Sequence, residues 1–126
     1  MDSSALVKLV FPEAESERLA DWLTARPEAP KLTSQLSLIE VVLTCQRHDP
    51  ALEPAARRLL AGLDLIPIGD AVVEGASQLR RPSLRSLCAI HLASALTLGV
   101  ELEAFVAYDI RLLEAARAER LPIVSP

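Results

Sequence analysis

Two aspartates stand where a strand is expected to give way to a helix, a placement that could serve metal chemistry. Asp2 lies where a first strand would end, and Asp109 follows the apolar run 105–107 and opens a helix. Both strands are expected to run the same way, so the two carboxylates would lie at one edge of a parallel sheet, where such sheets carry their functional sites. The alternative for each residue is a simple helix N-cap, a common role of Asp.

Glu40 is a third carboxylate of interest because it lies on an apolar helical stripe, between Leu36 and Leu43. A carboxylate on a buried face is costly unless it is paired or binds a cation. The alternatives are therefore an Arg or Lys partner, or a role in metal binding or acid–base chemistry. Together with Asp2 and Asp109, Glu40 could hold Mg²⁺, which prefers oxygen ligands and can activate water for phosphodiester cleavage.

Alternating helices and short strands are expected to position these acids. Apolar stripes and capping residues predict helices over 3–9, 15–25, 36–47, 51–61, 70–79, 84–98 and 110–119. Strands are predicted over 31–34, 63–68, 104–107 and 122–124. Ser3 or Ser4 is expected to cap the first helix, Asp70 a later one, and Gly62 to close the helix at 51–61. The helix at 84–98 is apolar on nearly every side, which is typical of a buried helix.

The predicted alternation favours an α/β fold in which a parallel sheet carries helices on both faces. One strand is missing from this pattern, since only Met1 and Asp2 precede the first helix. Either the chain lacks its first strand, or its natural start lies upstream.

Composition favours one cytoplasmic domain over residues 1–126. The chain has 126 residues, of which 51% are hydrophobic, so it can bury its own core. The net charge of −4 argues against a protein that grips many phosphates over a basic surface. Cys45 and Cys88 have neither metal-ligand nor redox spacing, which indicates a reducing cytoplasm. We expect no membrane span and no export signal.

Four segments resemble the motifs of VapC-type PIN-domain ribonucleases, the toxins of type II toxin–antitoxin pairs. They are 2–9 (DSSALVKL), 38–40 (LIE), 84–93 (LRSLCAIHLA) and 105–112 (FVAYDIRL). The segments occur in the order that the family has and span nearly the whole chain. The resemblance implies a PIN-like three-layer α/β/α fold with a short, mostly parallel sheet.

The same resemblance implies a function, a cofactor and partners. Family members cut RNA, often transfer RNA, with Mg²⁺ or Mn²⁺; a VapB-type antitoxin inhibits them, and they commonly form homodimers. In the family pattern Asp2 is the first acidic ligand, Glu40 the second acidic residue and Asp109 the fourth. A Mg²⁺-dependent endoribonuclease toxin is therefore expected.

The chain departs from the family pattern at two residues besides its missing strand. Cys88 stands where the family has a third Asp, and Ala107 where it often has a hydroxyl residue. A neutral thiol is not a hard ligand, and losing a unit charge about 4 Å from a cation could cost up to ~4 kcal/mol. We therefore predict impaired Mg²⁺ binding and activity. The alternatives are that Cys88 is a small buried residue or, with His91 one turn away, a ligand for Zn²⁺ or Fe²⁺.

Arg80, Arg81 and Arg85 cluster just ahead of Cys88. One interpretation is a solvated surface run. The other is a clamp for RNA phosphate beside the metal, since Arg suits bidentate phosphate contacts. In the family an antitoxin tail can occupy the active-site groove, so the same arginines could receive its acidic or carboxyl-terminal group.

Two other functional classes are compatible with a small α/β chain of this length. The first is a degenerate PIN domain that binds its antitoxin and itself but no longer cuts RNA. The second is a phosphoryl-accepting receiver-like domain, which is also α/β and of similar length. A receiver requires a late Lys, and this chain has no Lys beyond Lys31, so the sequence argues against that class.

Overall fold

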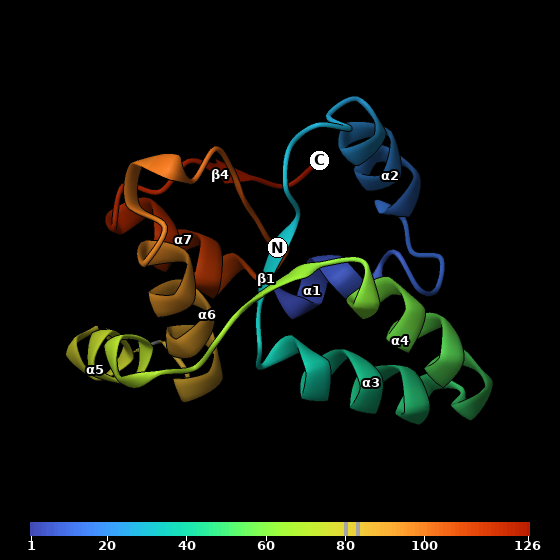
Figure 1. Cartoon of the computed structure of the whole chain (residues 1–126), viewed down its shortest axis with the longest axis horizontal. Coiled ribbons are helices and arrows are strands. Elements are labelled where there is room, and N and C mark those ends of the chain that lie inside the picture. Colours follow the sequence, from blue (N-terminus) through green and yellow to red (C-terminus); the bar gives the residue numbers. More distant parts are fainter. Residues whose placement is uncertain (80, 83) are drawn as a thin grey trace.

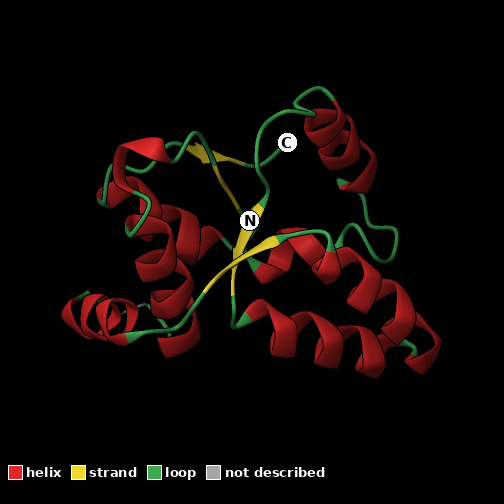
Figure 2. Cartoon of the chain, viewed as in Figure 1, coloured by secondary structure: helices red, strands yellow, loops and turns green. Residues whose placement is uncertain are grey.

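Short strands at the centre of the molecule are flanked by helices on both sides (Figures 1 and 2). The computed structural model describes residues 1–79, 81–82 and 84–126. The helices are α1 (Ser3–Val7), α2 (Ser16–Thr24), α3 (Ser37–His48), α4 (Glu53–Ala61), α5 (Asp70–Gln78), α6 (Ser86–Leu96) and α7 (Ile110–Ala118). Short 3₁₀ turns are η1 (Pro50–Leu52) and η2 (Gly99–Glu101), and the strands are β1 (Leu32–Ser34), β2 (Asp64–Ile66), β3 (Phe105–Val106) and β4 (Ile123–Val124). The mixed α/β architecture expected from the sequence is confirmed.

The strands form two parallel pairs, β1 with β2 and β3 with β4. Paired residues are Leu32–Asp64, Thr33–Leu65 and Ser34–Ile66 in one pair, and Phe105–Ile123 and Val106–Val124 in the other. Residues 1 and 2 connect the pairs: the Met1 amine donates to the Leu32 carbonyl oxygen at 2.7 Å, and the Asp2 N–H donates to the Val106 carbonyl oxygen at 3.0 Å. Asp2 is thereby fixed next to the end of β3.

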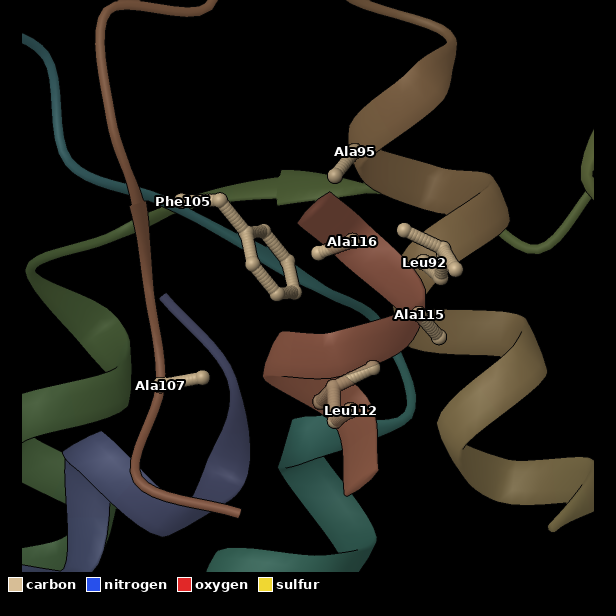
Figure 3. Packing of buried hydrophobic residues seen from close by; sticks show 7 residues of the cluster. All are labelled: Leu92, Ala95, Phe105, Ala107, Leu112, Ala115 and Ala116. Carbon is tan, nitrogen blue, oxygen red and sulfur yellow. The ribbon is translucent and has the colours of Figure 1, made fainter. Parts of the chain in front are cut away.

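Three apolar clusters fix the helices around these strands. The first packs β3 against α6 and α7 (Figure 3); its members are Leu92, Ala95, Phe105, Ala107, Leu112, Ala115 and Ala116. The second joins α1 to α3 and α4, and the third joins α1 to α2 and β3 through Ala5, Leu19 and Val106. Helix α1 takes part in two clusters, so Asp2, which directly precedes it, has a well-supported position.

The first helix begins at Ser3, as predicted, but its cap is a different residue from the one expected. Its N-cap is Asp2, whose Oδ1 accepts the Ala5 N–H at 3.1 Å, so the prediction of Ser3 or Ser4 as the cap is wrong. A carboxylate is as good an N-cap as a serine hydroxyl, and the extended backbone of Asp2 places it correctly. The capping role considered for Asp2 is therefore confirmed.

Other predicted helix ends were partly right. Asp109 caps α7 by accepting the Leu112 N–H at 2.9 Å, and Gly62 follows α4 as expected. The prediction that Asp70 is a cap is wrong: the N-cap of α5 is Gly69, and Asp70 is the first helical residue. An acid in the first turn still interacts favourably with the helix dipole.

Strands are shorter than predicted, whereas the buried helix is confirmed. The strand expected over 63–68 is reduced to Asp64–Ile66, because the next N–H that faces β1, that of Ile68, donates to the side-chain oxygen of Gln35 at 3.3 Å and not to a main-chain carbonyl. Helix α6 buries six residues, Ala89 and the run 91–95, as its apolar sequence predicted. Within the described ranges, no helix is both long and apolar enough to cross a membrane.

A largely apolar cavity of about 500 Å³ lies beside the chain's first residue. Its wall includes Met1, all of β1 and β3, and residues of α2 and α6. The cavity therefore lies between the two strand pairs.

Candidate active site

Cys88 lies in the first turn of α6, and the charges of the predicted acids act on its thiol. Burial raises the pKa of its thiol. The negative charges of Asp109, Asp2 and Glu40 raise this pKa further, while Arg85 acts in the opposite direction. Charges act on a pKa in this way over short distances. Of the three acids, Asp109 lines the same cavity as Cys88, and Asp2 and Glu40 are near enough for their charges to affect the thiol.

Asp2 is the most buried of these acids, with 4% of its surface exposed. Burial raises the pKa of its carboxyl group, against the opposing effect of hydrogen bonds from Ser4 and Ala5 and of the charge of His91. Both hydrogen bonds, at 2.7 and 3.1 Å, end on Oδ1. Oδ2 therefore has no hydrogen-bond donor among the described residues, and a nearby cation would stabilise this carboxylate.

Glu40 projects from the first turn of α3 and is half-buried. Its Oε2 accepts hydrogen bonds from Ser3 Oγ and from His91 Nε2, both at 2.6 Å. Burial acts to raise the pKa of Glu40, but the bonds to His91 and Ser3 outweigh it, so the pKa is lowered. The partner of this carboxylate in the structure is His91, not the Arg or Lys that the sequence offered as an alternative.

Asp109 is exposed and lines a second cavity, of about 420 Å³. Its Oδ1 caps α7, so Oδ2 is free of protein donors in the described part of the chain. The residues around this cavity are Leu84, Arg85, Cys88, Tyr108, Asp109, Ile110 and Arg111. The cavity therefore opens the neighbourhood of Cys88 to solvent and presents cationic side chains at its rim.

The donor set fits a hydrated hard cation in kind, but the acids do not form a ready-made cluster. Among residues 1–79, 81–82 and 84–126, no three His, Cys, Asp or Glu side chains are grouped as a metal site. Mg²⁺ keeps several of its waters and is commonly held by only one or two carboxylates. Asp2 and Asp109 each have an oxygen available for this, whereas the Cys88 thiol is kept neutral by its raised pKa.

The idea that Cys88 and His91 bind a softer metal receives no support from the geometry. Among the described residues, Cys88 and His91 belong to no group of three His, Cys, Asp or Glu side chains that could hold a metal. The Nε2 atom of His91 already contacts Glu40.

The three arginines of the predicted clamp have different surroundings. Arg85 is exposed and lines the cavity beside Asp109. Arg81 forms an ion pair with Glu119 at 3.0 Å. Arg80 lies outside the described residues. Of these three arginines, only Arg85 is therefore seen beside a candidate acid, Asp109.

Ala107 contributes no polar group to the site. Its side chain is fully buried in the apolar cluster between β3 and α7 (Figure 3). Its carbonyl oxygen accepts a hydrogen bond from Ser125 at 2.7 Å.

Sequence reasoning missed two polar neighbours of the acids. Ser3, considered only as a cap, donates to Glu40, and Arg111 lines the cavity of Asp109. Both lie close to a candidate acid in the sequence: Ser3 is one residue after Asp2, and Arg111 is two residues after Asp109. That proximity was the only signal, since neither residue interrupts an apolar pattern.

Comparison with known proteins relates this arrangement to a family. Residues 1–118 match the family model described as PIN domain. Relatives from Mycobacterium tuberculosis align over the whole chain and over 95% of their own length: Ribonuclease VapC35 is 44% identical, Ribonuclease VapC47 41% and Ribonuclease VapC46 38%. Matches of this extent show descent from a common ancestor, and the chain therefore belongs to the PIN-domain family, as a homologue of the VapC ribonucleases.

Proposed function

We propose that this protein is a metal-dependent RNA endonuclease, the toxin of a type II toxin–antitoxin pair. The observation that carries the proposal is that Ser3, the neighbour of Asp2, donates to Glu40, while Asp109 shares a cavity with Cys88. The effect of all three carboxylates on the pKa of Cys88 supports it. The full-length similarity to proteins named ribonucleases supports the substrate class. Residues 1–126 would act as one domain inside the cell, with RNA, such as transfer RNA, as substrate.

In this proposal Asp2 and Asp109 are the residues that would hold a Mg²⁺ or Mn²⁺ ion. The ion would supply charge neutralisation at the phosphate and an activated water. Glu40 stays ionised near neutral pH because His91 and Ser3 lower its pKa. It can therefore accept a hydrogen bond from the attacking water and orient it. Arg85, exposed at the cavity rim, would contact an RNA phosphate, and Arg80 would have the same role. Arg81 would take part only after release from its ion pair with Glu119.

The proposed partners are a VapB-type antitoxin and a second copy of the chain. Exposed apolar side chains on α3 support such contacts, because Ile39 is 61% and Leu43 47% exposed. Apolar groups grouped on one helix surface are typical of protein interfaces.

A second candidate function is a degenerate PIN domain that binds antitoxin and itself without cutting RNA. It is favoured by one specific observation: at the position where the family has its third Asp, this chain has a thiol whose pKa is raised. Undetectable cleavage together with tight antitoxin binding would support it over the nuclease.

RNA cleavage by the purified chain tests the proposal. We expect slow cleavage of a transfer RNA mixture with Mn²⁺ or Mg²⁺, none with EDTA, and a loss of at least about tenfold in Asp2→Asn and Asp109→Asn, since each change removes a metal charge partner. Asp49→Asn, an exposed acid at the other end of α3, is the matched control and should cleave normally. Cleavage that survives EDTA, or that is equal in all three variants, would contradict a metal-dependent site.

A further inference from the structure

A chain of buried hydroxyl groups runs beneath Glu40. Thr33 Oγ1 donates to the Met1 carbonyl oxygen at 2.8 Å and contacts Ser37 Oγ at 2.7 Å. Ser37 Oγ lies 3.2 Å from Ser3 Oγ, which donates to Glu40 at 2.6 Å. The groups come from β1, α3 and the start of α1, and Thr33 and Ser37 are essentially inaccessible to solvent.

Counting hydrogens shows which of these contacts are firm. Each hydroxyl has one hydrogen to donate. Thr33 gives its hydrogen to Met1, and Ser3 gives its own to Glu40, so the hydrogen of Ser37 is best used in the 2.7 Å contact with Thr33. Neither hydroxyl then has a hydrogen left to donate across the 3.2 Å between Ser3 and Ser37. The network therefore divides into a structural half at Thr33 and Ser37 and a half that serves Glu40.

The same counting fixes the form of His91. An ionised Glu40 has only acceptor atoms, so a distance of 2.6 Å to His91 Nε2 requires a hydrogen on Nε2. His91 is 6% exposed and lies 3.3 Å from Ser3 Oγ. Ser3 and His91 thus donate to one oxygen, Oε2, and Oε1 is left without a donor among the described residues.

We propose that Ser3 and His91 are positioning residues, which together hold the Glu40 carboxylate by Oε2 so that Oε1 is presented to water. This inference rests on the proposed nuclease function. Two donors on one oxygen remove the rotational freedom of the carboxylate, and a small misplacement of a catalytic group can cost about 100-fold in rate. A purely structural role would instead be to satisfy buried polar atoms, which affects folding more than turnover.

The kinetic test compares variants that lose the donor with variants that keep one. Ser3→Ala and His91→Leu should lower kcat for RNA by about 10- to 100-fold with KM within about twofold. Ser3→Thr and His91→Gln, which retain an O–H or N–H, should recover much of that loss. The Ser3 variants and the His91 variants test the role independently, so the result still stands if one of the variants fails to fold.

Ser37→Ala is the matched control, because it removes a buried hydroxyl from the structural half of the network. It should lower Tm at least as much as Ser3→Ala while kcat stays within about threefold. If Ser37→Ala lowers kcat as much as Ser3→Ala, or if the retained donors restore nothing, the positioning role is wrong. Absence of cleavage by the unmodified chain with either metal would instead overturn the proposed function and this inference together.

Nitrogen-15 NMR of the histidine rings provides a test that does not require activity. His91, identified by the resonances lost in His91→Gln, should carry hydrogen on Nε2, and its Nε2 resonance should shift in Glu40→Gln. A neutral ring with hydrogen on Nδ1 alone, or a resonance indifferent to Glu40→Gln, would overturn the contact on which the inference depends. Such a result with RNA cleavage intact would leave the nuclease proposal standing.

Discussion

Replacing Cys88 with Asp is expected to raise Mg²⁺-dependent RNA cleavage by about 10- to 100-fold at limiting metal. A new carboxylate would stand among Asp2, Glu40 and Asp109, next to the proposed ion. One added charge pair is worth up to ~4 kcal/mol at an effective dielectric near 20, and solvent would reduce this to about 1.4–2.8 kcal/mol, or one to two factors of ten. Calorimetric titration with Mg²⁺ and Mn²⁺ should show the same gain in affinity.

Cys88→Ser is the control for this substitution, because it keeps the size and neutrality of the thiol. It should gain little metal affinity. In EDTA, Cys88→Asp should have a lower Tm than the unmodified chain, since a fourth carboxylate is placed beside three others. In excess Mg²⁺, Cys88→Asp should instead have the higher Tm of the two. A Cys88→Asp protein whose metal affinity and Tm match those of Cys88→Ser would show that this position is not part of an ion site.

A second large effect is expected from adding a strand before Met1. Four β-branched apolar residues placed there should enter the cavity of about 500 Å³ between β1 and β3. Burial contributes about 1.5–3 kcal/mol per apolar side chain and new ladder hydrogen bonds about 1 kcal/mol each, against about 1–2 kcal/mol per ordered residue. We expect a net gain of about 2 kcal/mol, seen as a rise in Tm of roughly 5–10 °C.

The pH dependence of this gain follows from the buried amine of Met1. Burial lowers the pKa of that amine from its ordinary value near 8, despite the charge of Asp2. The unfolded chain therefore binds the proton more tightly, and the stability of the chain rises with pH between the lowered pKa and about 8. In the extended protein the amine becomes a peptide N–H, so that rise should disappear. The extension should therefore raise the stability of the protein most at pH values below the lowered pKa of the Met1 amine.

A Gly-Ser extension of the same length separates filling of the cavity from removal of the charge. It should abolish the pH-dependent rise but give little of the gain in Tm above pH 8, because it has no apolar side chains to bury. Equal Tm values for the apolar and Gly-Ser extensions would show that a strand does not enter the cavity.

Local sequence features predicted the arrangement of elements but not their extents. The caps at Asp109 and Gly62 and the buried helix α6 follow from neighbouring residues alone. The cap at Asp70 failed because Gly69 offered an extended backbone one position earlier. The predicted strand lengths were wrong for a different reason: pairing between strands depends on partners elsewhere in the chain. The ladder of β2 ends where the Ile68 N–H meets the Gln35 side chain, before the apolar pattern of the strand ends.

In the site, too, the features that depend on neighbouring residues could be predicted, and the contacts between distant residues could not. The position of Asp2 and Asp109 at the starts of helices was visible in the sequence. The partner of Glu40 was not, because His91 lies 51 residues away on another helix, and nothing in the local pattern of either helix indicates that they meet. Arg81 likewise reaches Glu119, 38 residues away. Contacts of this kind depend on tertiary packing, which periodicity does not describe.

The pKa of the Cys88 thiol is the most direct test of the claim that three distant carboxylates share one site. It can be measured from the pH dependence of alkylation by iodoacetamide, since the thiolate is the reacting form, with peptide mass spectrometry to separate Cys88 from the fully buried Cys45. The pKa should lie above that of an ordinary thiol and fall in Asp109→Asn, Asp2→Asn and Glu40→Gln, but not in the distant surface variant Glu28→Gln. An ordinary pKa that none of the three changes would contradict the convergence of the acids.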